Sequence, residues 1–297
     1  MQPDVTQFSV TAPAGRQLQV LAAGPEDGLP LVFHNGTPSG LVAFAPMVDA
    51  AAERGLRTVM YARPGYGGST PDPGRRVSSA PADVAAVLDK LGVEHFVTAG
   101  WSGGGPHALA CGALLPDRCR AVASIAGVAP YGADGLDWLA GMAAENVAEF
   151  GAALAGEAEL NAFLEAGAAE LRDITAAQVA EGMGDLASEV DKSVITGEFA
   201  SYLAEAFRAG VAAGIAGWRE DDLAFAAAWG FTLGAGAPVT VWPGDQDLMV
   251  PFAHGQWLAA QMPAARAHLV TGAGHLSLGV TDFGAILDEL LAIAGVR

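Results

Sequence analysis

The chain has 297 residues, 52% of them hydrophobic, which predicts one large domain, or one domain carrying an insertion, with a sizeable buried core. The formal charge of −18 comes from 33 acidic and 15 basic residues. Because negative charge repels phosphate groups and anionic lipid, we expect neither a nucleic-acid partner nor a membrane partner.

The cysteines and the N-terminal segment indicate the cellular compartment of the protein. Two cysteines, Cys111 and Cys119, are too few for a disulfide framework or a cysteine-rich metal site, and Cys111 is expected in the core. Residues 1–8 have neither the basic nor the apolar region of a signal peptide. No apolar run reaches the ~18 residues that a membrane span needs. We therefore expect a cytoplasmic protein.

Up to residue 130, short strand-like runs alternate with helical patterns. The apolar or alternating runs predict strands, and the longer periodic stretches predict helices. Strands are expected at 16–21, 30–34, 57–61, 95–100 and 121–126, and helices at about 41–54, 81–91 and 104–115. This alternation predicts an α/β fold in which helices flank both faces of a mostly parallel sheet.

The pattern changes between residues 131 and 235, where the chain is alanine-rich, helical and dotted with aromatic residues. Strand and helix patterns then return. Strands are expected at 238–242 and 267–270, and helices at about 253–261 and 282–294. The sequence thus predicts a core formed by residues 1–130 and 236–297, interrupted by a helical insertion at 131–235.

A glycine-rich stretch surrounds Ser102. Residues 100–104, Gly-Trp-Ser-Gly-Gly, match G-x-S-x-G and lie between an expected strand and an expected helix. A serine at such a turn has a strained backbone, which lifts its hydroxyl above the sheet edge and toward the positive end of the helix. We expect the glycines to be required because side chains there would collide with neighbouring elements. Ser102 is therefore a candidate nucleophile; the alternative is a tight turn without a chemical role.

A nucleophilic serine needs a base that an acid orients. Such a fold places the acid and then the base after later strands. Asp247 follows the strand at 238–242, with Asp245 as a competitor that could instead cap a turn. His275 follows the last strand, in an expected loop. The sequence predicts a Ser102, Asp247 and His275 triad.

The other histidines are expected to be structural or exposed. His34 is expected to brace the loop after its strand by hydrogen bonding. The remaining four are His95, His107, His254 and His268. They show no metal-ligand spacing, so we expect no metal and no cofactor.

Acyl transfer also needs donors for an oxyanion. The N–H of Gly103, the residue after the serine, is one expected donor. The second is expected from the loop at 33–40, from Thr37 or alternatively from Gly36.

Five segments together resemble the α/β-hydrolase superfamily, in the expected order and over nearly the whole chain. They are H34-N-G-T-P-S39, Y61-A-R-P-G-Y-G-G-S69, G100-W-S-G-G104, G244-D-Q-D-L-M-V-P251 and G274-H275. The resemblance implies an α/β-hydrolase fold in which the insertion at 131–235 is a helical cap (lid), and a pocket wall formed by residues 63–69. Asn35 stands where many members have a glycine, so the second oxyanion donor stays open. Dehalogenases and epoxide hydrolases of this superfamily use a carboxylate at the elbow, so Ser102 argues against both activities.

We expect a serine hydrolase that cleaves a carboxylic ester, or a related acyl bond, of a small and partly apolar molecule. The alternatives are carbon–carbon bond cleavage or another non-hydrolytic reaction, a ligand-binding scaffold with low turnover, and a prolyl aminopeptidase-like peptidase. The peptidase would need a carboxylate in the cap for the substrate amine. The cap pair Asp221 and Asp222 is interpreted as solvated or helix-capping. The oligomeric state is not predicted.

Overall fold

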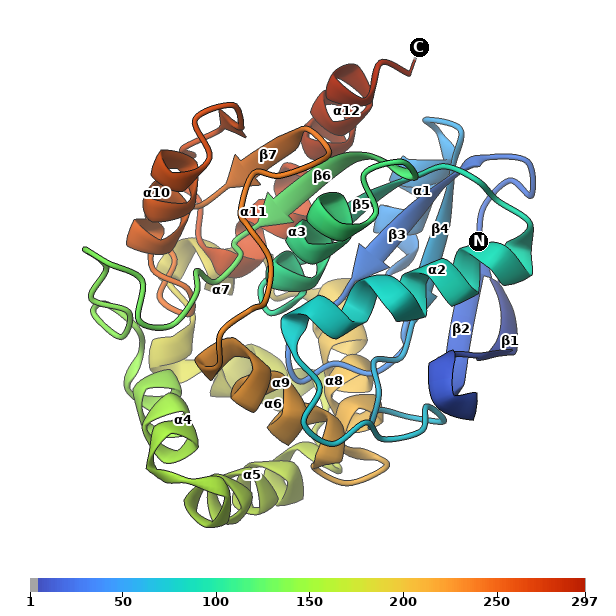
Figure 1. The fold of residues 1–297 in the computed structure, drawn as a ribbon. Helices are drawn as coiled ribbons and strands as arrows, with labels where there is room; N and C mark the ends of the chain where they lie inside the picture. The colour runs from blue at the N-terminus through green and yellow to red at the C-terminus, as the bar shows by residue number, and fades with distance from the viewer. Residues whose placement is uncertain (1–4, 297) are drawn as a thin grey trace.

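An eight-stranded sheet forms the centre of the computed structural model, which describes residues 5–296 (Figure 1). The first four residues of the N-terminal segment discussed above lie outside this range. The sheet order is β1-β2-β4-β3-β5-β6-β7-β8. The strands are β1 Val5–Thr11, β2 Gln17–Ala23, β3 Leu29–His34, β4 Leu56–Tyr61, β5 Phe96–Trp101, β6 Cys119–Ile125, β7 Val239–Trp242 and β8 Arg266–Ala267. From β4 to β8 neighbouring strands are parallel, while β1 and β2 pair antiparallel, so the predicted fold class is confirmed.

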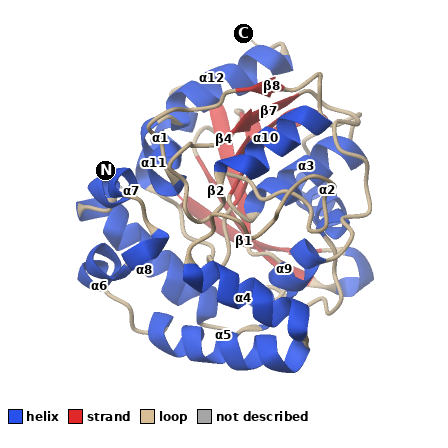
Figure 2. Cartoon of the chain, turned by 90° about the vertical axis from the view of Figure 1, so that its left-hand side faces the viewer, coloured by secondary structure: helices blue, strands red, loops and turns tan. Residues whose placement is uncertain are grey.

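Helices cover both faces of the sheet because its central strands are apolar on both sides; in β5 all six residues are buried. Helices α1 and α12 pack on one face, and α2, α3 and α10 on the other (Figure 2). Their bounds are α1 Ala45–Ala52, α2 Ala80–Leu91, α3 Gly104–Leu114, α10 Phe252–Gln261 and α12 Phe283–Ala294, with short 3₁₀ turns at Pro13–Gly15 and Val77–Ser79. Cys111 is fully buried in α3, as predicted.

A group of helices lies between β6 and β7 in sequence, and we refer to residues 144–226 as the helical segment. It gathers beyond the sheet in the lower part of Figure 1. The helices are α4 Ala144–Ala155, α5 Glu157–Leu171, α6 Ala176–Gly182, α7 Glu189–Val194, α8 Gly197–Val211 and α9 Ala216–Ala226, with a 3₁₀ turn at Gly184–Leu186. All of them fall within the predicted insertion at 131–235.

Three elements differ from the sequence-based prediction. Strand β1 was not expected, because most of its residues are exposed at the sheet edge and give no apolar pattern. Strand β8 has only two residues, both exposed, and a single parallel bridge between Gly244 and Val270 continues its pairing. The third element is helix α11, His275–Thr281, in place of a loop.

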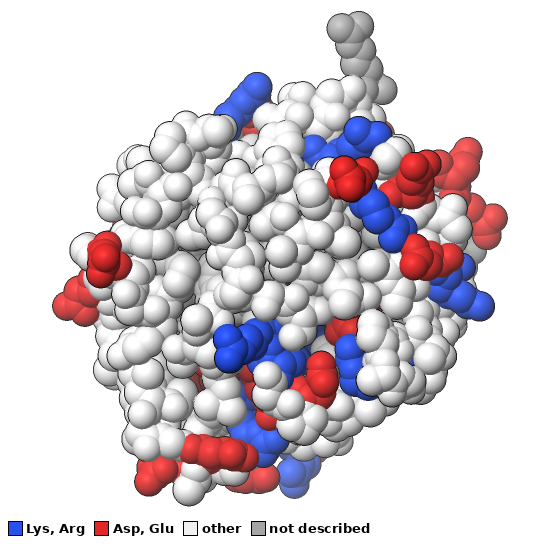
Figure 3. Space-filling model, in the orientation of Figure 1, with Lys and Arg blue, Asp and Glu red and all other residues white. Residues whose placement is uncertain are grey.

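The surface in Figure 3 shows basic side chains next to acidic ones. Among the ion pairs of the described residues are Arg118 with Asp89 at 2.7 Å and Arg54 with Asp288 at 2.6 Å. Between residues 5 and 296, no helix combines the length and the apolar character needed to cross a membrane.

Candidate active site

Ser102 lies at the turn between β5 and α3, with a φ of 57° in the left-handed region. Its N–H donates to the carbonyl of Ile125 at 2.9 Å, which ties the turn to the neighbouring strand. The adjacent glycines are required, as predicted: a Cβ at Gly100 would overlap the carbonyl oxygen of Gly104, and one at Gly104 would overlap that of His34. The local backbone therefore presents the Ser102 side chain to the cavity described below.

Asp247 and His275 come together at the ends of neighbouring strands. His275 Nδ1 and Asp247 Oδ2 are 2.8 Å apart, and both side chains are buried. The other oxygen of Asp247 accepts the N–H groups of Met249 and Val250, each at 2.8 Å. Asp245 instead accepts the N–H of Gly272, which is the turn-capping role considered for it above. Of the two candidate acids, Asp247 is the one that contacts the histidine.

The surroundings of His275 favour its protonated form. Burial lowers the pKa of His275. The charge of Asp247 and the hydrogen bond to it have a larger, opposite effect, so the pKa lies above its ordinary value. Burial raises the pKa of Asp247. Trp101 lies beside the imidazole, with ring centroids 6.2 Å apart, and donates its indole N–H to the His275 carbonyl at 3.0 Å. Among the described residues, Ser102 Oγ has no hydrogen-bond partner within 3.5 Å. Ser102 and the imidazole of His275 are therefore not hydrogen-bonded to each other in this structure.

The expectation of a loop at His275 is wrong, because this residue begins helix α11. The cause is Asp191 of α7, a residue that the sequence analysis missed. Its carboxylate accepts the N–H of His275 at 2.9 Å and those of Leu276 and Ser277 at 2.8 Å each. A carboxylate at this end satisfies free N–H groups and complements the helix dipole. Gly274 lets Asp191 approach, since a Cβ there would meet the carboxylate.

The expected oxyanion donors lie next to one another. A Cβ at Gly103 would come within 2.6 Å of Thr37 Oγ1, and one at Gly36 within 3.3 Å of Ser102 Cβ. The backbone N–H groups of Gly36, Thr37 and Gly103 donate to none of the residues that the structure describes. Three unused donors therefore surround Ser102, and both candidates for the second position remain open.

The interpretation of Asp221 as solvated or helix-capping is wrong, because its side chain is fully buried. It accepts hydrogen bonds from Arg63 and Arg75 at 2.6 Å each, and from Tyr66 and Thr37 at 2.9 Å each. Burial raises the pKa of Asp221. The two guanidinium groups have a larger, opposite effect, so the pKa lies well below its usual range. The helical segment thus places a charged carboxylate under the loop that carries Thr37.

Arg63 connects this carboxylate to the loop backbone. It donates to the carbonyls of Asn35 at 2.6 Å and Gly36 at 2.9 Å. Residues 63–69 do not line the cavity beside Ser102, so the expectation that they form a pocket wall is wrong. Arg63 instead supports the loop from behind.

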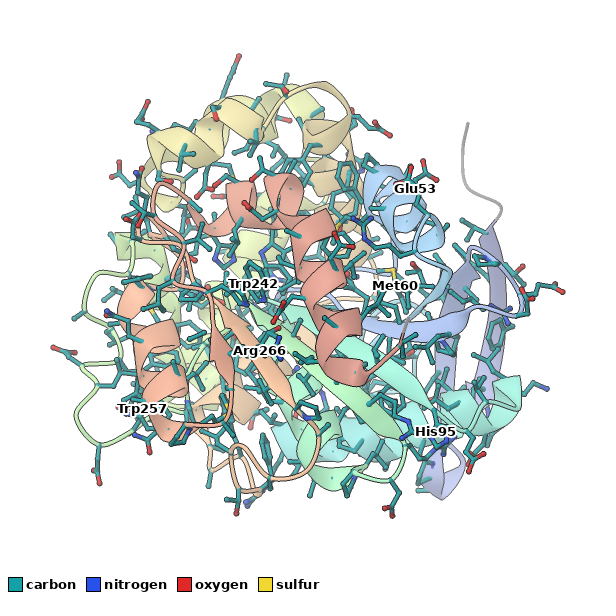
Figure 4. The ribbon with its side chains drawn as sticks, turned by 90° about the horizontal axis from the view of Figure 1, so that it is seen from above. Glu53, Met60, His95, Trp242, Trp257 and Arg266 are labelled. Atoms are coloured by element: carbon teal, nitrogen blue, oxygen red, sulfur yellow. The ribbon has the colours of Figure 1, made fainter. Side chains whose placement is uncertain are left out.

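The expectation that His34 braces this loop is also wrong. His34 is buried against Tyr61 and His107, and its Nδ1 has no partner among the described residues. Burial lowers the pKa of His34 and, together with nearby Arg63, lowers that of His107 to about 3, so both rings are neutral. His95 lies just before β5, at the opposite end of that strand from Ser102 (Figure 4).

A cavity of about 270 Å³ opens beside Ser102, between the sheet and the helical segment. Its walls combine apolar side chains with a few acids. One of these acids is Asp222, which is buried, so the interpretation of Asp222 as solvated or helix-capping is wrong as well. Four of the aromatic residues noted in the helical region line it: Phe150, Phe207, Trp218 and Phe225. The others include Trp138, Phe199, Tyr202 and Trp229, which are buried in the core.

The comparison with protein families matches residues 30–280 to the alpha/beta hydrolase fold. The chain belongs to this family. A non-heme chloroperoxidase from Streptomyces lividans is 32% identical over 124 residues, which are 41% of this chain and 45% of that protein. Epoxide hydrolase B from Mycobacterium tuberculosis is 30% identical over 132 residues, which are 43% of this chain and 36% of that protein. The matches thus span less than half of either relative.

A solved structure agrees with this assignment of the fold. The bromoperoxidase from Bacillus anthracis superposes with a TM-score of 0.67 at 21% identity, over 97% of this alpha/beta hydrolase and 99% of the other chain. At this identity the likeness concerns the fold alone.

Proposed function

We propose that this alpha/beta hydrolase cleaves carboxylic esters of small, partly apolar molecules, with Ser102 as the nucleophile. The observation that carries the proposal is the 2.8 Å contact of His275 with Asp247, beside a serine held at a positive φ. The unused N–H groups around Ser102 and the apolar part of the cavity lining support it.

The proposed reaction has two halves. Ser102 Oγ attacks the carbonyl carbon while His275 Nε2 takes the hydroxyl proton. The oxyanion forms next to the N–H groups of Gly103 and of Thr37 or Gly36. When the intermediate collapses, the ester bond breaks, and His275 gives its proton to the departing alcohol.

Water completes the cycle. His275 takes a proton from a water molecule, the resulting hydroxide attacks the acyl-enzyme carbonyl, and the carboxylic acid leaves as Ser102 regains its proton. Asp247 keeps the Nδ1 proton in place and stabilises the imidazolium in both halves. The hydrogen bond between Ser102 and His275 is expected to form once substrate is bound, since such bonds are often long in the free enzyme.

The experiment is turnover of p-nitrophenyl esters of increasing acyl length by the wild type and by Ser102→Ala. We expect measurable hydrolysis by the wild type and none above background in the variant. Labelling with a fluorophosphonate reports separately whether Ser102 is activated. If no ester is turned over while Ser102 is labelled, ester hydrolysis is wrong and carbon–carbon or peptide substrates come next. If Ser102 is not labelled either, the serine-hydrolase proposal is wrong.

A further inference from the structure

The charged groups in the lining of the cavity beside Ser102 are all acidic. They are Glu145, Glu149, Glu170 and Asp222. No lysine, arginine or histidine is among the described residues that line this cavity. Glu145 and Glu170 are exposed at the surface, whereas Glu149 is partly buried and Asp222 is buried. The inner part of the cavity therefore has two carboxyl groups and no basic side chain in its lining.

Asp222 lacks the basic partner that buried acids ordinarily have. It is 1% exposed, no N–H or O–H group of another residue type donates to its carboxyl oxygens among the described residues, and its side-chain hydrogen bond is with the carboxyl group of Glu149, so the two acids share a proton. The adjacent Asp221, by contrast, accepts hydrogen bonds from two arginines, so the charge of the acid that supports the Thr37 loop is compensated. Two buried carboxyl groups side by side without a cation are costly, and a native protein rarely retains such a pair without a use. Asp222 and Glu149 both border the cavity, so a bound ligand can supply the missing cation.

Glu149 reaches the same part of the cavity from helix α4, while Asp222 comes from α9. The indole N–H of Trp218 donates to Glu149 Oε1 at 2.6 Å and fixes the orientation of the carboxyl group. A second, pre-oriented acid beside Asp222 creates a site for a group with several N–H donors and positive charge.

The pKa values of the two acids agree with a missing cation. Burial raises the pKa of Glu149 to about 7. Burial and the neighbouring charge of Glu149 raise the pKa of Asp222 well above its ordinary value. The charged groups that act on the pair are Glu145 and Asp221, which disfavour further negative charge, and Arg75, which has a smaller opposite effect. A bound cation would favour the ionised form of both acids.

The acids lie close to where the scissile carbonyl would be held. Asp222 and Phe225 are three residues apart on α9 and therefore share one face, with their Cβ atoms about 5–6 Å apart. The Phe225 ring lies 2.9 Å from the position that a Cβ would take at Gly103. A group bound at Asp222 is thus within the length of a short acyl chain from the Gly103 N–H.

We propose that this cavity binds esters whose acyl part carries a protonated primary or secondary amine, with the ammonium group held by Asp222 and Glu149. The inference rests on the proposed function of Ser102 and names the substrate class for it. The apolar side chains of the lining would contact the rest of the molecule.

The test compares two benzyl esters of nearly equal shape at pH 7. In L-alanine benzyl ester an ammonium group takes the place of one methyl group of benzyl isobutyrate. We expect the wild type to prefer the alanine ester in kcat/KM by about 30-fold or more, a factor typical of a buried charge pair. Asp222→Asn and Glu149→Gln are each expected to reduce this preference at least tenfold. Glu165→Gln removes the same charge from an exposed position of α5 outside the cavity and should leave the preference unchanged.

Binding separates this inference from the proposed chemistry. Ser102→Ala is titrated calorimetrically with each ester, and tighter binding of the alanine ester is expected, lost when Asp222→Asn is added. If both esters are hydrolysed without a preference, or if Asp222→Asn and Glu149→Gln both keep it, the ammonium site is wrong and the serine hydrolase stands. If the alanine ester binds selectively but Ser102 is neither labelled nor required for turnover, the ammonium site stands and the chemistry is wrong. Equal binding of both esters overturns the site.

Discussion

Asp221 and Asp222 are adjacent acids of the same helix, and the structure predicts opposite effects for one substitution at the two positions. Asp221→Asn removes the charge that faces Arg63 and Arg75, each at 2.6 Å, with all three side chains at most 4% exposed. Removing one member of a buried ion pair costs about 3–5 kcal/mol, because the partner is left buried and uncompensated. Here two guanidinium groups lose their partner, so we expect a loss at or above this range.

The adjacent substitution is the matched control. Asp222→Asn removes a carboxyl group that has no basic partner among the described residues and whose side-chain hydrogen bond is with the acid Glu149, to which an amide can still donate, so we expect the free energy of unfolding to stay within about 1 kcal/mol of wild type or to rise. A gain would fit a residue kept for ligand binding at some cost in stability.

The assay is urea unfolding at pH 7, followed by tryptophan fluorescence and circular dichroism. Because the pKa of Asp221 is depressed in the folded state, its contribution is fully present above the pKa of an unfolded aspartate and is lost only in acid. A domain of this kind has about 5–15 kcal/mol of stability in total, so Asp221→Asn should unfold at much lower urea or fail to fold. Equal losses in the two variants, or a loss below about 1 kcal/mol for Asp221→Asn, would refute the reasoning.

Three further predictions concern the site and its supports. Asp191→Ala should lower the free energy of unfolding by about 1–2 kcal/mol, because three N–H groups of α11 lose their acceptor, and should lower kcat for p-nitrophenyl acetate as His275 loses its support. Since the general base must be neutral and the pKa of His275 is raised, kcat/KM for the same ester should fall in acid through a pKa above 6.5, and Asp247→Asn should lower that pKa as well as the rate. Gly104→Ala should prevent folding or abolish labelling of Ser102, since the new Cβ would overlap the His34 carbonyl, whereas Gly151→Ala, in open space on α4, should stabilise by about 0.5–1 kcal/mol.

Each of these has an outcome that contradicts it. Unchanged unfolding and kcat in Asp191→Ala would mean that α11 does not depend on this contact. An acid limb at or below 6.5 in the wild type would contradict the effect of Asp247 on the imidazole. Normal folding and labelling of Gly104→Ala would contradict the packing of the turn.

Ser102 and Asp247 could be placed because each follows a buried strand whose apolar pattern is readable, whereas His275 follows the short, exposed β8 and could be placed only by its order along the chain. The carboxyl ends of parallel strands meet at one edge, so their order along the chain was enough to bring Asp247 and His275 together. The choice between Asp245 and Asp247 also followed from spacing, and the contact with His275 agrees with it. This part of the site could therefore be predicted from short local patterns in the sequence.

The supporting residues could not be predicted in the same way. Asp191 is 84 residues from His275, and Asp221 is 158 residues from Arg63. Acids in a helical, acidic stretch suggest a solvated surface, and only the folded chain shows that these are buried. His34 was expected to support its loop because it directly precedes it, but Arg63, from the loop after the adjacent strand β4, makes the hydrogen bonds to that loop.

The central claim is that Ser102 is activated by His275, and the most direct test is intact-mass analysis after reaction with a fluorophosphonate. The account predicts one adduct per chain on the wild type, mapped to Ser102 by peptide sequencing, and strongly slowed labelling in a folded His275→Ala variant. An adduct on another residue, or equally fast labelling of Ser102 without His275, would contradict it.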